Sequence, residues 1–521
     1  MKKITFMLAI CMIASTFAGC GNKKAEGKGK DKLTWWTTNY AVKYVENYGN
    51  VEAYKKIQEK TGIDIEFVHA NVNQMSEQFN IMVSSGDMAD IIDYNYTYYP
   101  GGVAKAIKDK IIITIDDYVK EGKTPNLSKI FKENPEIEKG SRNFDGTLAL
   151  FPSLKQDISI NAYFGPMIRE DWLKKLGLEI PTGIEEWHTV LTAFKNNDPN
   201  GNGEADEIPL VADKNAQFST LAAAYGVTNN FCLKNGEKVV YGPMEPEFKE
   251  FLAEMNKWYN EGLIDKEFAA LTQVNVDSRI TSDVGGAFVG YSGSQMGNYI
   301  AAKKGEDVNF KLSAAPWPSA NGGKGYSGLD EMARLVSNGQ GAGISSTNKN
   351  VEKTIKLLDY CYSDEATELQ NWGIEGKTYT KENGKNKFTD DIVNNPDGKD
   401  PMEAISKYAL PIYGSGGKIM DSAAYNAIGR AYDEQKAAAD TWSKADLSLL
   451  LPTLVFTMDE TEVIADVMGD ITSYYNEMLV KIITGVEPVS MHDEFVKKIK
   501  DMNIEKAIKA YRTAYDRYKK N

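Results

Sequence analysis

The segment between Leu33 and Tyr94 alternates between two hydrophobic periods, and this alternation restricts the fold more than any other feature of the chain. Short stretches with the period of a strand are separated by amphipathic stretches with the period of a helix. This order predicts a parallel sheet whose strands are joined by helical crossovers, and therefore an α/β fold. The expected strands are Leu33–Thr37, Ile63–Val68 and Asp90–Tyr94, and the expected helices are Val51–Thr61 and Gln74–Ser84.

The chain is too long for one ordinary core. It has 521 residues, and single cores stop growing at roughly 250–300 residues, so two large domains are expected. The formal net charge of −13 argues against a nucleic-acid partner, because phosphate binding needs a basic face. The three histidines, His69, His188 and His492, include no pair at zinc-ligand spacing, which argues against a His-rich metal enzyme.

The N-terminus has the pattern of a secretory signal. Two lysines precede an apolar stretch that ends at Cys20 and is short for a membrane span. The end of this stretch resembles a bacterial lipobox, although Phe17 stands where Leu is usual. The resemblance implies a lipoprotein signal peptide over residues 1–19 and lipidation of Cys20, with the protein on the extracellular face of the cell membrane. The alternative is a plain signal peptide followed by a chance cysteine.

The segment after the proposed signal is unsuited to packing. Residues 20–32 are rich in Lys and Gly, and Ala25 is the only apolar residue after Cys20. Such a segment predicts a tether between anchor and folded domains, and its positive charge suits the surface of an anionic membrane.

A run of oxygen-bearing residues between Asp198 and Glu207 has the spacing of a calcium loop. Side-chain oxygens fall at loop positions 1, 3, 5 and 9, and Gly203 occupies position 6, where the loop turns sharply. Position 12 is Pro209, so the usual bidentate Glu is missing. The alternative is a polar Asn/Gly turn after a helix, which this composition also satisfies. The candidate ligands of a structural Ca²⁺ are Asp198, Asn200, Asn202, Glu204 through its backbone carbonyl, Asp206 and Glu207.

The lipobox, the alternating segment and this loop together resemble a bacterial extracellular solute-binding protein of family 1. The chain is similar to the lipoprotein branch that includes aldouronate- and alginate-oligosaccharide binders of ABC importers. Each motif is weak alone, and their order makes the resemblance specific. The motifs are Ile168–Leu178 continued by Pro181, Trp187 and Phe194, the loop with Glu207–Leu210, Trp258–Asp265, Trp372–Gly376, Phe456–Glu460, Ile483–Gly485 and Tyr515–Tyr518.

This resemblance implies a two-lobe, type II periplasmic-binding-protein-like fold with a hinge and a ligand cleft between the lobes. It also implies a function: a monomeric substrate-binding lipoprotein that captures an oligosaccharide by lobe closure and delivers it to ABC-transporter permease subunits. In the alginate binders the equivalent loop holds calcium, which supports Ca²⁺ as a structural cofactor here.

The resemblance further implies that the chain crosses between the lobes more than once. We expect crossings near Pro152–Gln156, Leu312–Trp317 and Glu382–Lys387. The N-terminal lobe would then comprise residues 33–155 and 313–384, and the C-terminal lobe residues 156–312 and 385–521. Cys232 and Cys361 would lie in different lobes, where a disulfide would oppose closure, so we predict free thiols.

Sugar-binding clefts combine aromatic planes for the apolar faces with polar side chains for the hydroxyl edges. Trp35 or Trp36 with Trp317 is the predicted pair of opposing platforms, and Arg334 would suit a uronate carboxylate. Core packing is the alternative for each aromatic residue, and the sequence does not decide between a neutral and an acidic ligand. The candidates, chosen by their places after strands or at crossings, are Trp35, Trp36, Tyr40, Tyr94, Tyr96, Tyr98, Tyr291, Trp317, Asp330, Glu331, Arg334 and Trp372.

Two other classes of function compete with the transport binder. A surface glycan-binding adhesin would also explain lipidation, although it needs no hinged cleft. A glycan-processing enzyme would need a carboxylate pair, for which Asp330–Glu331 and Asp459–Glu460 are the candidates. The sequence lacks a G-x-S-x-G nucleophile motif at its Gly-Ser runs, and Gly339–Gly343 lacks the Gly-Lys-Ser/Thr of a P-loop, so we expect no catalysis.

Overall fold

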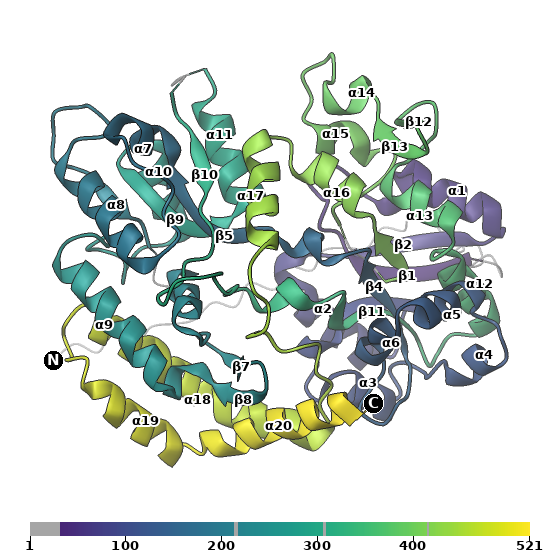
Figure 1. The fold of residues 1–521 in the computed structure, drawn as a ribbon. Coiled ribbons are helices and arrows are strands. Elements are labelled where there is room, and N and C mark those ends of the chain that lie inside the picture. Colours follow the sequence, from purple (N-terminus) through teal and green to yellow (C-terminus); the bar gives the residue numbers. More distant parts are fainter. Residues whose placement is uncertain (1–31, 213–216, 306–308, 414–415, 521) are drawn as a thin grey trace, which may run out of the picture.

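Two separate β-sheets organise the fold, one in each half of the molecule (Figure 1). The computed structural model describes residues 32–212, 217–305, 309–413 and 416–520. The predicted signal peptide, Cys20 and all of the tether except Lys32 lie outside these residues. Among the described residues, no helix is long and apolar enough to cross a membrane.

The first lobe is built on a six-stranded sheet of order β14-β4-β11-β3-β1-β2. β1 runs parallel to β2 and β3, which confirms the predicted parallel arrangement, whereas β11 runs antiparallel to β3 and β4. The strands are β1 (Lys32–Thr38), β2 (Asp64–Ala70), β3 (Ile91–Asn95), β4 (Leu150–Lys155), β11 (Val336–Ile344) and β14 (Lys418–Met420), and β12 (Tyr379–Glu382) and β13 (Lys385–Phe388) form a hairpin beside them.

The first lobe contains eleven α-helices among the described residues. The two predicted crossover helices are present as α1 and α2, and each ends at a glycine in the left-handed conformation, Gly62 and Gly86. The helices are α1 (Glu52–Thr61), α2 (Met75–Ser85), α3 (Gly102–Lys108), α4 (Asp116–Lys120), α5 (Pro125–Glu133), α6 (Pro135–Ser141), α12 (Val351–Tyr360), α13 (Asp364–Asn371), α14 (Asp390–Val393), α15 (Pro401–Ser406) and α16 (Ser422–Gly429).

The second lobe is built on a four-stranded sheet of order β10-β5-β9-β6, with a separate hairpin. The long helix α18 begins at a capping box, in which the Thr457 hydroxyl and the Glu460 carboxylate each accept the other residue's backbone N–H. The strands are β5 (Phe164–Arg169), β6 (Ile208–Leu210), β9 (Gly285–Tyr291), β10 (Leu312–Ala314) and the hairpin β7 (Phe231–Lys234) with β8 (Lys238–Tyr241). The helices are α7 (Glu170–Leu176), α8 (Ile184–Asn196), α9 (Pro246–Asn260), α10 (Gln273–Thr281), α11 (Asn298–Lys303), α17 (Asp433–Ser443), α18 (Met458–Ile483), α19 (Met491–Asp501) and α20 (Ile504–Lys520).

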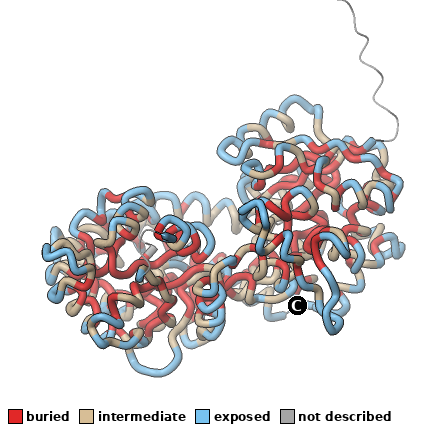
Figure 2. The backbone as a smooth tube through the Cα atoms, turned by 90° about the horizontal axis from the view of Figure 1, so that it is seen from above, coloured by how far each residue is buried: buried red, intermediate tan, exposed pale blue. Residues whose placement is uncertain are grey.

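Buried residues gather in two masses that meet at a narrower waist (Figure 2). The core of the second lobe contains Trp317 and Met332, and it resumes at Ala438. The first-lobe core resumes at Val336 and continues to Ile428. The chain therefore crosses between Leu154 and Ala162, between Met332 and Val336, and between Ile428 and Ala438.

These cores confirm the first expected crossing and correct the other two. The segment after β10 stays in the second lobe, because Ala315 N–H donates to Pro166 O and Trp442 Nε1 donates to Ala315 O. The turn at Asn383 and Gly384 is the tip of the β12–β13 hairpin within the first lobe. Residues 313–333 thus belong to the second lobe, and residues 385–413 and 416–428 belong to the first.

Candidate functional site

Three tyrosines are exposed at the ends of strands in the two sheets. Tyr40 follows β1, Tyr98 follows β3, and Tyr291 ends β9; their exposed fractions are 41%, 54% and 40%. Ligands of open α/β sheets bind beyond the carboxyl ends of the strands. These three predicted contacts are therefore placed where a ligand can reach them.

On the second lobe, Tyr291 forms part of an aromatic pair at the lobe crossing. Its ring stacks on that of Tyr163, with ring centres 6.1 Å apart and planes 16° apart. The Tyr163 hydroxyl donates a hydrogen bond of 2.5 Å to the exposed carboxylate of Glu331. Burial raises the pKa of Tyr163, and the negative charge of Glu331 raises it further. The pair offers an aromatic surface with a carboxylate at its edge.

On the first lobe, Tyr40 lies close to Tyr98 and to the buried carboxylate of Asp93. Tyr98 meets Tyr94 edge to face at 6.3 Å. Asp93 accepts hydrogen bonds from Thr37 Oγ1 at 3.1 Å and from the backbone N–H of Gly416 at 3.0 Å. Burial raises the pKa of Asp93 to about 6, so its carboxylate is mainly ionised at neutral pH.

Between the lobes, a polar network holds the crossing segments together. Lys155 Nζ donates to Asn161 Oδ1 at 2.5 Å, and Asn161 Nδ2 donates to Arg334 O at 2.8 Å. The Arg430 guanidinium donates to the main-chain oxygens of Ser159 and Ala162 at 3.0 and 3.1 Å. The cations Lys155 and Arg430 are thus held by the protein itself.

Two further predicted contacts lie beside this network. Asp330 Oδ2 accepts a hydrogen bond from Asn230 Nδ2 at 3.2 Å. Burial raises the pKa of Asp330, and the Arg334 guanidinium opposes that shift, so the two side chains are close in space. Asp330 and Glu331 have different hydrogen-bond partners, Asn230 and Tyr163.

The predicted tryptophan platforms lie in the cores. Trp35, Trp36, Trp317 and Trp372 are each at most 5% exposed. Trp35 packs on Phe67, Trp36 lies between Phe79 and Tyr94, Trp317 packs near Phe164, and Trp372 packs on Phe388. Tyr94 and Tyr96 are also buried. This corrects the expectation that these six rings stack on a ligand, including the pairing of Trp35 or Trp36 with Trp317.

Sequence reasoning missed Tyr163, Tyr425 and the crossing network. Tyr163 stands immediately before β5, so its position beside a strand end was a usable signal. Tyr425 comes from α16 of the first lobe, yet its hydroxyl influences the pKa of Tyr163 in the second lobe. No local pattern brings together residues that are more than 250 positions apart.

The candidate calcium loop folds around Asp198. This residue adopts a left-handed conformation, with φ of 45°, and its carboxylate accepts the backbone N–H groups of Gly201, Asn202 and Gly203. The Asn202 side chain donates to the Asp206 carboxylate, and so does that of Asn200. Oxygen-bearing side chains therefore converge within one turn, as the spacing predicts.

Glu207 is the unusual member of this loop. Both of its carboxylate oxygens are buried without a hydrogen-bond partner. Burial raises the pKa of Glu207, and the charges of Asp206 and Asp198 raise it further. Among the described residues, no group of three or more His, Cys, Asp or Glu side chains is arranged to hold a metal ion. An uncompensated buried carboxylate beside two others nevertheless suits a divalent cation.

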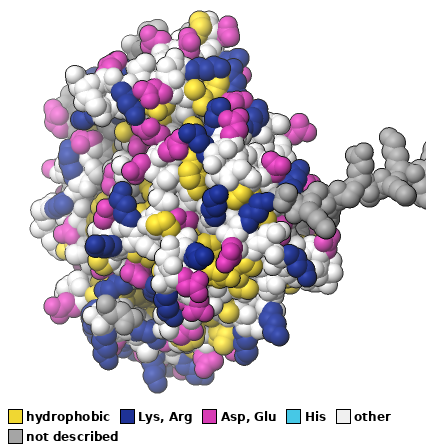
Figure 3. All heavy atoms as spheres, turned by 90° about the vertical axis from the view of Figure 1, so that its right-hand side faces the viewer, with side chains coloured by type: hydrophobic (Ala, Val, Ile, Leu, Met, Phe, Trp, Pro, Cys, Tyr) yellow, Lys and Arg dark blue, Asp and Glu magenta, His cyan; other side chains and the backbone are white. Residues whose placement is uncertain are grey.

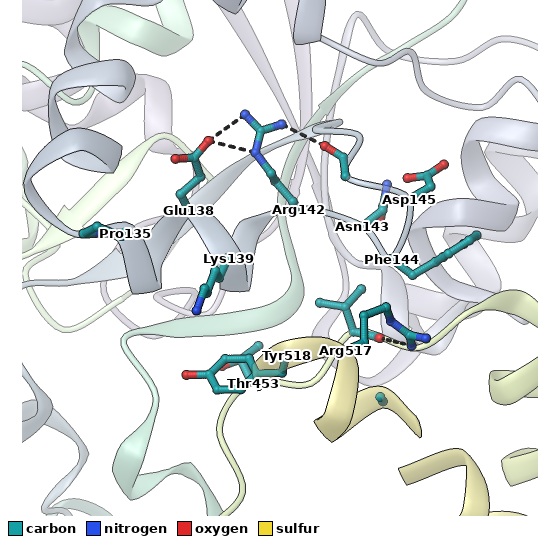
Figure 4. A pocket seen from close by; sticks show the side chains of 13 residues that line it. Pro135, Glu138, Lys139, Arg142, Asn143, Phe144, Asp145, Thr453, Arg517 and Tyr518 are labelled. Atoms are coloured by element: carbon teal, nitrogen blue, oxygen red, sulfur yellow. Dashed lines mark hydrogen bonds and ion pairs between the residues drawn. The ribbon is translucent and has the colours of Figure 1, made fainter. Parts of the chain in front are cut away.

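A cavity of about 530 Å³ lies at the seam between the lobes, on the side of the C-terminal helix (Figure 4). The Tyr518 hydroxyl of α20 donates to Glu136 of α6, and Lys139 Nζ lies 5.1 Å from the Tyr518 ring centre. The exposed tyrosines described above are not part of its lining. The lining residues are Pro135, Glu138, Lys139, Arg142, Asn143, Phe144, Asp145, Gly146, Thr453, Val455, Ala514, Arg517 and Tyr518.

The two cysteines of the described chain are not bonded to each other. Cys232 is buried in the second-lobe core and Cys361 in the first-lobe core, which confirms the predicted free thiols. Burial raises the pKa of Cys232 to about 11 and that of Cys361 to about 12, so neither is a reactive thiolate at neutral pH.

Known proteins share this architecture. FusA, a fructooligosaccharide ABC transporter substrate-binding protein of Streptococcus pneumoniae serotype 4, is 28% identical over 496 residues, which cover 90% of the chain and 87% of FusA. Lipoprotein LipO of Bacillus subtilis strain 168 is 26% identical over 373 residues, 69% of each protein. The solved structure of alginate-binding protein AlgQ2 without calcium ion matches with a TM-score of 0.67 at 23% identity, covering 93% of the chain and 98% of AlgQ2.

The likeness to AlgQ2 confirms the predicted two-lobe solute-binding fold. The family model described as bacterial extracellular solute-binding protein matches residues 23–368, more than half of the sequence. This chain therefore belongs to the bacterial extracellular solute-binding proteins.

Proposed function

We propose that this protein captures an oligosaccharide between its lobes and delivers it to the permease of an ABC importer. The observation that carries the proposal is the placement of exposed tyrosines at strand ends of both lobes, Tyr40 and Tyr98 on one and Tyr291, stacked on the half-buried Tyr163, on the other. Aromatic faces bind the apolar faces of sugar rings, and the neighbouring polar groups bind hydroxyls. The fructooligosaccharide-binding role of FusA supports the sugar class.

Lobe closure follows from the division of the site. Each lobe alone holds part of a ligand, and only the closed form contacts both of its faces. A ligand that binds the closed form better shifts the population toward closure. The crossings near Lys155, Arg334 and Arg430 are the segments about which the lobes would rotate.

The test combines calorimetry with X-ray scattering on the purified monomeric protein. Neutral and acidic oligosaccharides, including kestose, are titrated into the protein, and scattering is recorded with and without each binding sugar. We expect a saturable complex and a smaller radius of gyration on binding. A glycan that is cleaved on incubation would identify an enzyme, and binding without closure would favour the adhesin.

We also propose that the loop from Asp198 to Glu207 holds a structural Ca²⁺. Asp198, Asn200, Asn202, Asp206 and Glu207 would supply side-chain oxygens, and Glu204 its backbone carbonyl. The partnerless carboxylate of Glu207 supports this assignment. Bound calcium would balance the three carboxylates and stabilise the lobe; it has no part in ligand chemistry.

Chelation tests the calcium site. Calcium that binds only the folded protein raises its melting temperature by mass action. We expect EDTA to lower the melting temperature of the wild type and to leave that of Asp198→Ala unchanged. Equal responses of the two proteins would mean that the loop binds no calcium. Glu477→Gln, which changes an exposed acid on α18, is the control.

Finally, we propose that Cys20 carries the lipid anchor that keeps the protein at the extracellular face of the membrane. The lipobox-like sequence supports this proposal, and so does the similarity to a protein named lipoprotein. Cys20→Ala should abolish palmitate labelling and release the protein from the membrane fraction. Retained labelling would contradict the assignment.

A further inference from the structure

The groups around the exposed tyrosines are acidic on both lobes. On the second lobe, the exposed Glu331 carboxylate accepts the Tyr163 hydroxyl. Burial raises the pKa of Tyr291, and Glu331 adds to this shift. The stacked pair of Tyr163 and Tyr291 therefore lies in the field of a carboxylate that solvent and ligand can reach.

The first lobe repeats this arrangement with a buried acid. Burial raises the pKa of Tyr40, and the nearby charge of Asp93 raises it further. Asp93 is only 7% exposed, so water screens its charge poorly. A ligand in contact with Tyr40 would therefore experience the negative potential of Asp93.

The cations at the lobe crossing interact with groups of the protein, and Lys155 lies close to Glu331. The ammonium of Lys155 donates a hydrogen bond to Asn161. The Arg430 guanidinium donates hydrogen bonds to two main-chain oxygens, and the residue is 2% exposed. Arg334 faces Asp330, and its buried Nε has no hydrogen-bond partner.

The first-lobe face seen in Figure 3 carries charges of both signs. Lys and Arg side chains alternate there with Asp and Glu. The formal net charge of the whole chain is −13, so the long-range field opposes an anion as well.

We propose that the site selects neutral oligosaccharides over uronate-containing ones, and that Glu331 is the residue that rejects the anionic sugar. The inference rests on the proposed function and decides the charge of its ligand, which family membership leaves open. A uronate carboxylate would lose hydration against Glu331 and Asp93, and the crossing cations Lys155 and Arg334 already lie close to Glu331 and Asp330. Specificity of this kind comes from a repulsive group built against the wrong ligand.

Matched ligands test the inference. Xylotriose is compared with its glucuronosyl-substituted counterpart, and methyl-esterified trigalacturonide with the free acid, beside kestose and nystose as further neutral sugars, all by calorimetry at low salt. We expect the tightest ligand to be neutral and each acid to bind at least about tenfold more weakly than its neutral partner. Tightest binding by a uronate would overturn the inference and leave the proposed function intact. Binding by neither class would overturn both.

A charge-neutralising variant tests whether Glu331 causes the selectivity against acidic sugars. Glu331→Gln keeps an acceptor for the Tyr163 hydroxyl and removes the charge. We expect it to shift the acid-to-neutral affinity ratio toward the acid by at least about fivefold, and we expect the shift to shrink at high salt. Glu477→Gln, an equal change of charge on α18, should leave the ratio as in the wild type. An unchanged ratio in folded Glu331→Gln, checked by circular dichroism, would remove Glu331 from the proposal.

Discussion

The ammonium of Lys418 donates a hydrogen bond of 2.7 Å to the main-chain oxygen of Tyr413. A second bond reaches the oxygen of Leu410, and the residue is 2% exposed. Burial lowers the pKa of Lys418 to about 7, because removal from water disfavours the charged form. The folded protein thus releases this proton at a pH where the unfolded chain still holds it.

Lys418→Met should therefore change how stability depends on pH. Above about pH 7, and up to the usual lysine pKa of 10.5, the unfolded chain binds one more proton than the folded protein. The free energy of unfolding of the wild type should then rise with pH, by roughly 1.4 kcal/mol per unit from this group. Urea unfolding at pH 7, 8 and 9 measures it. The free energy of unfolding of the wild type minus that of Lys418→Met should increase with pH. The corresponding difference for Lys120→Met, at an exposed site, should not change with pH.

A second prediction concerns the buried arginine at the end of β5. Arg169 is 2% exposed, pairs with Asp171 and Asp283, and lies between the rings of Trp172 and Phe310. Arg169→Met would leave two carboxylates without their shared cation. We expect a loss of about 3 kcal/mol in the free energy of unfolding, measured by urea titration. A loss no larger than that of Lys174→Met, an exposed neighbour, would mean that the ion pairs contribute little.

The two buried thiols should be unreactive in the folded protein. We expect a thiol reagent to label neither Cys232 nor Cys361 at pH 7.5, since both are buried with raised pKa values. In denaturant, protein that lacks residues 1–20 should show two reactive thiols. Fewer than two reactive thiols in denaturant under non-reducing conditions would reveal a disulfide. The variant Cys361→Ser would then show whether this disulfide joins the two lobes.

Local features of this chain were predictable, and contacts between distant segments were not. The alternation from Leu33 to Tyr94 gave the right strands and helices, because hydrophobic period depends on neighbouring residues. Two of three lobe crossings were misplaced: an Asn-Gly turn at Asn383 marks a hairpin as readily as a domain boundary. Which lobe receives a segment is decided by packing between residues far apart in sequence.

The tryptophans show the same limit at the site. Trp35 and Trp36 are successive residues of β1, so their side chains point to opposite faces of the sheet. β1 lies inside the sheet between β2 and β3, and core clusters cover both faces, so both rings are buried. Tyr40, Tyr98 and Tyr291 are exposed because they lie at or beyond the end of the strand pairing, and their contact with a ligand stays a prediction.

This contrast between exposed and buried rings gives the last prediction. Trp36→Ala should remove a ring packed between Phe79 and Tyr94 and cost about 3–5 kcal/mol of stability. Tyr291→Ala should cost at most about 1 kcal/mol, because the ring is 40% exposed. Its effect should instead fall on binding, with a loss of at least about tenfold in affinity for a neutral oligosaccharide that binds the wild type.

Both variants are measured by urea unfolding and by calorimetry with the same sugar. Tyr291→Phe is the matched control: it keeps the stack on Tyr163 and removes the hydroxyl, so it should retain most of the affinity lost in Tyr291→Ala. If Tyr291→Ala binds as tightly as the wild type, the ligand does not lie on the Tyr163–Tyr291 pair. The tyrosines of the first lobe, Tyr40 and Tyr98, would then be the remaining aromatic platform.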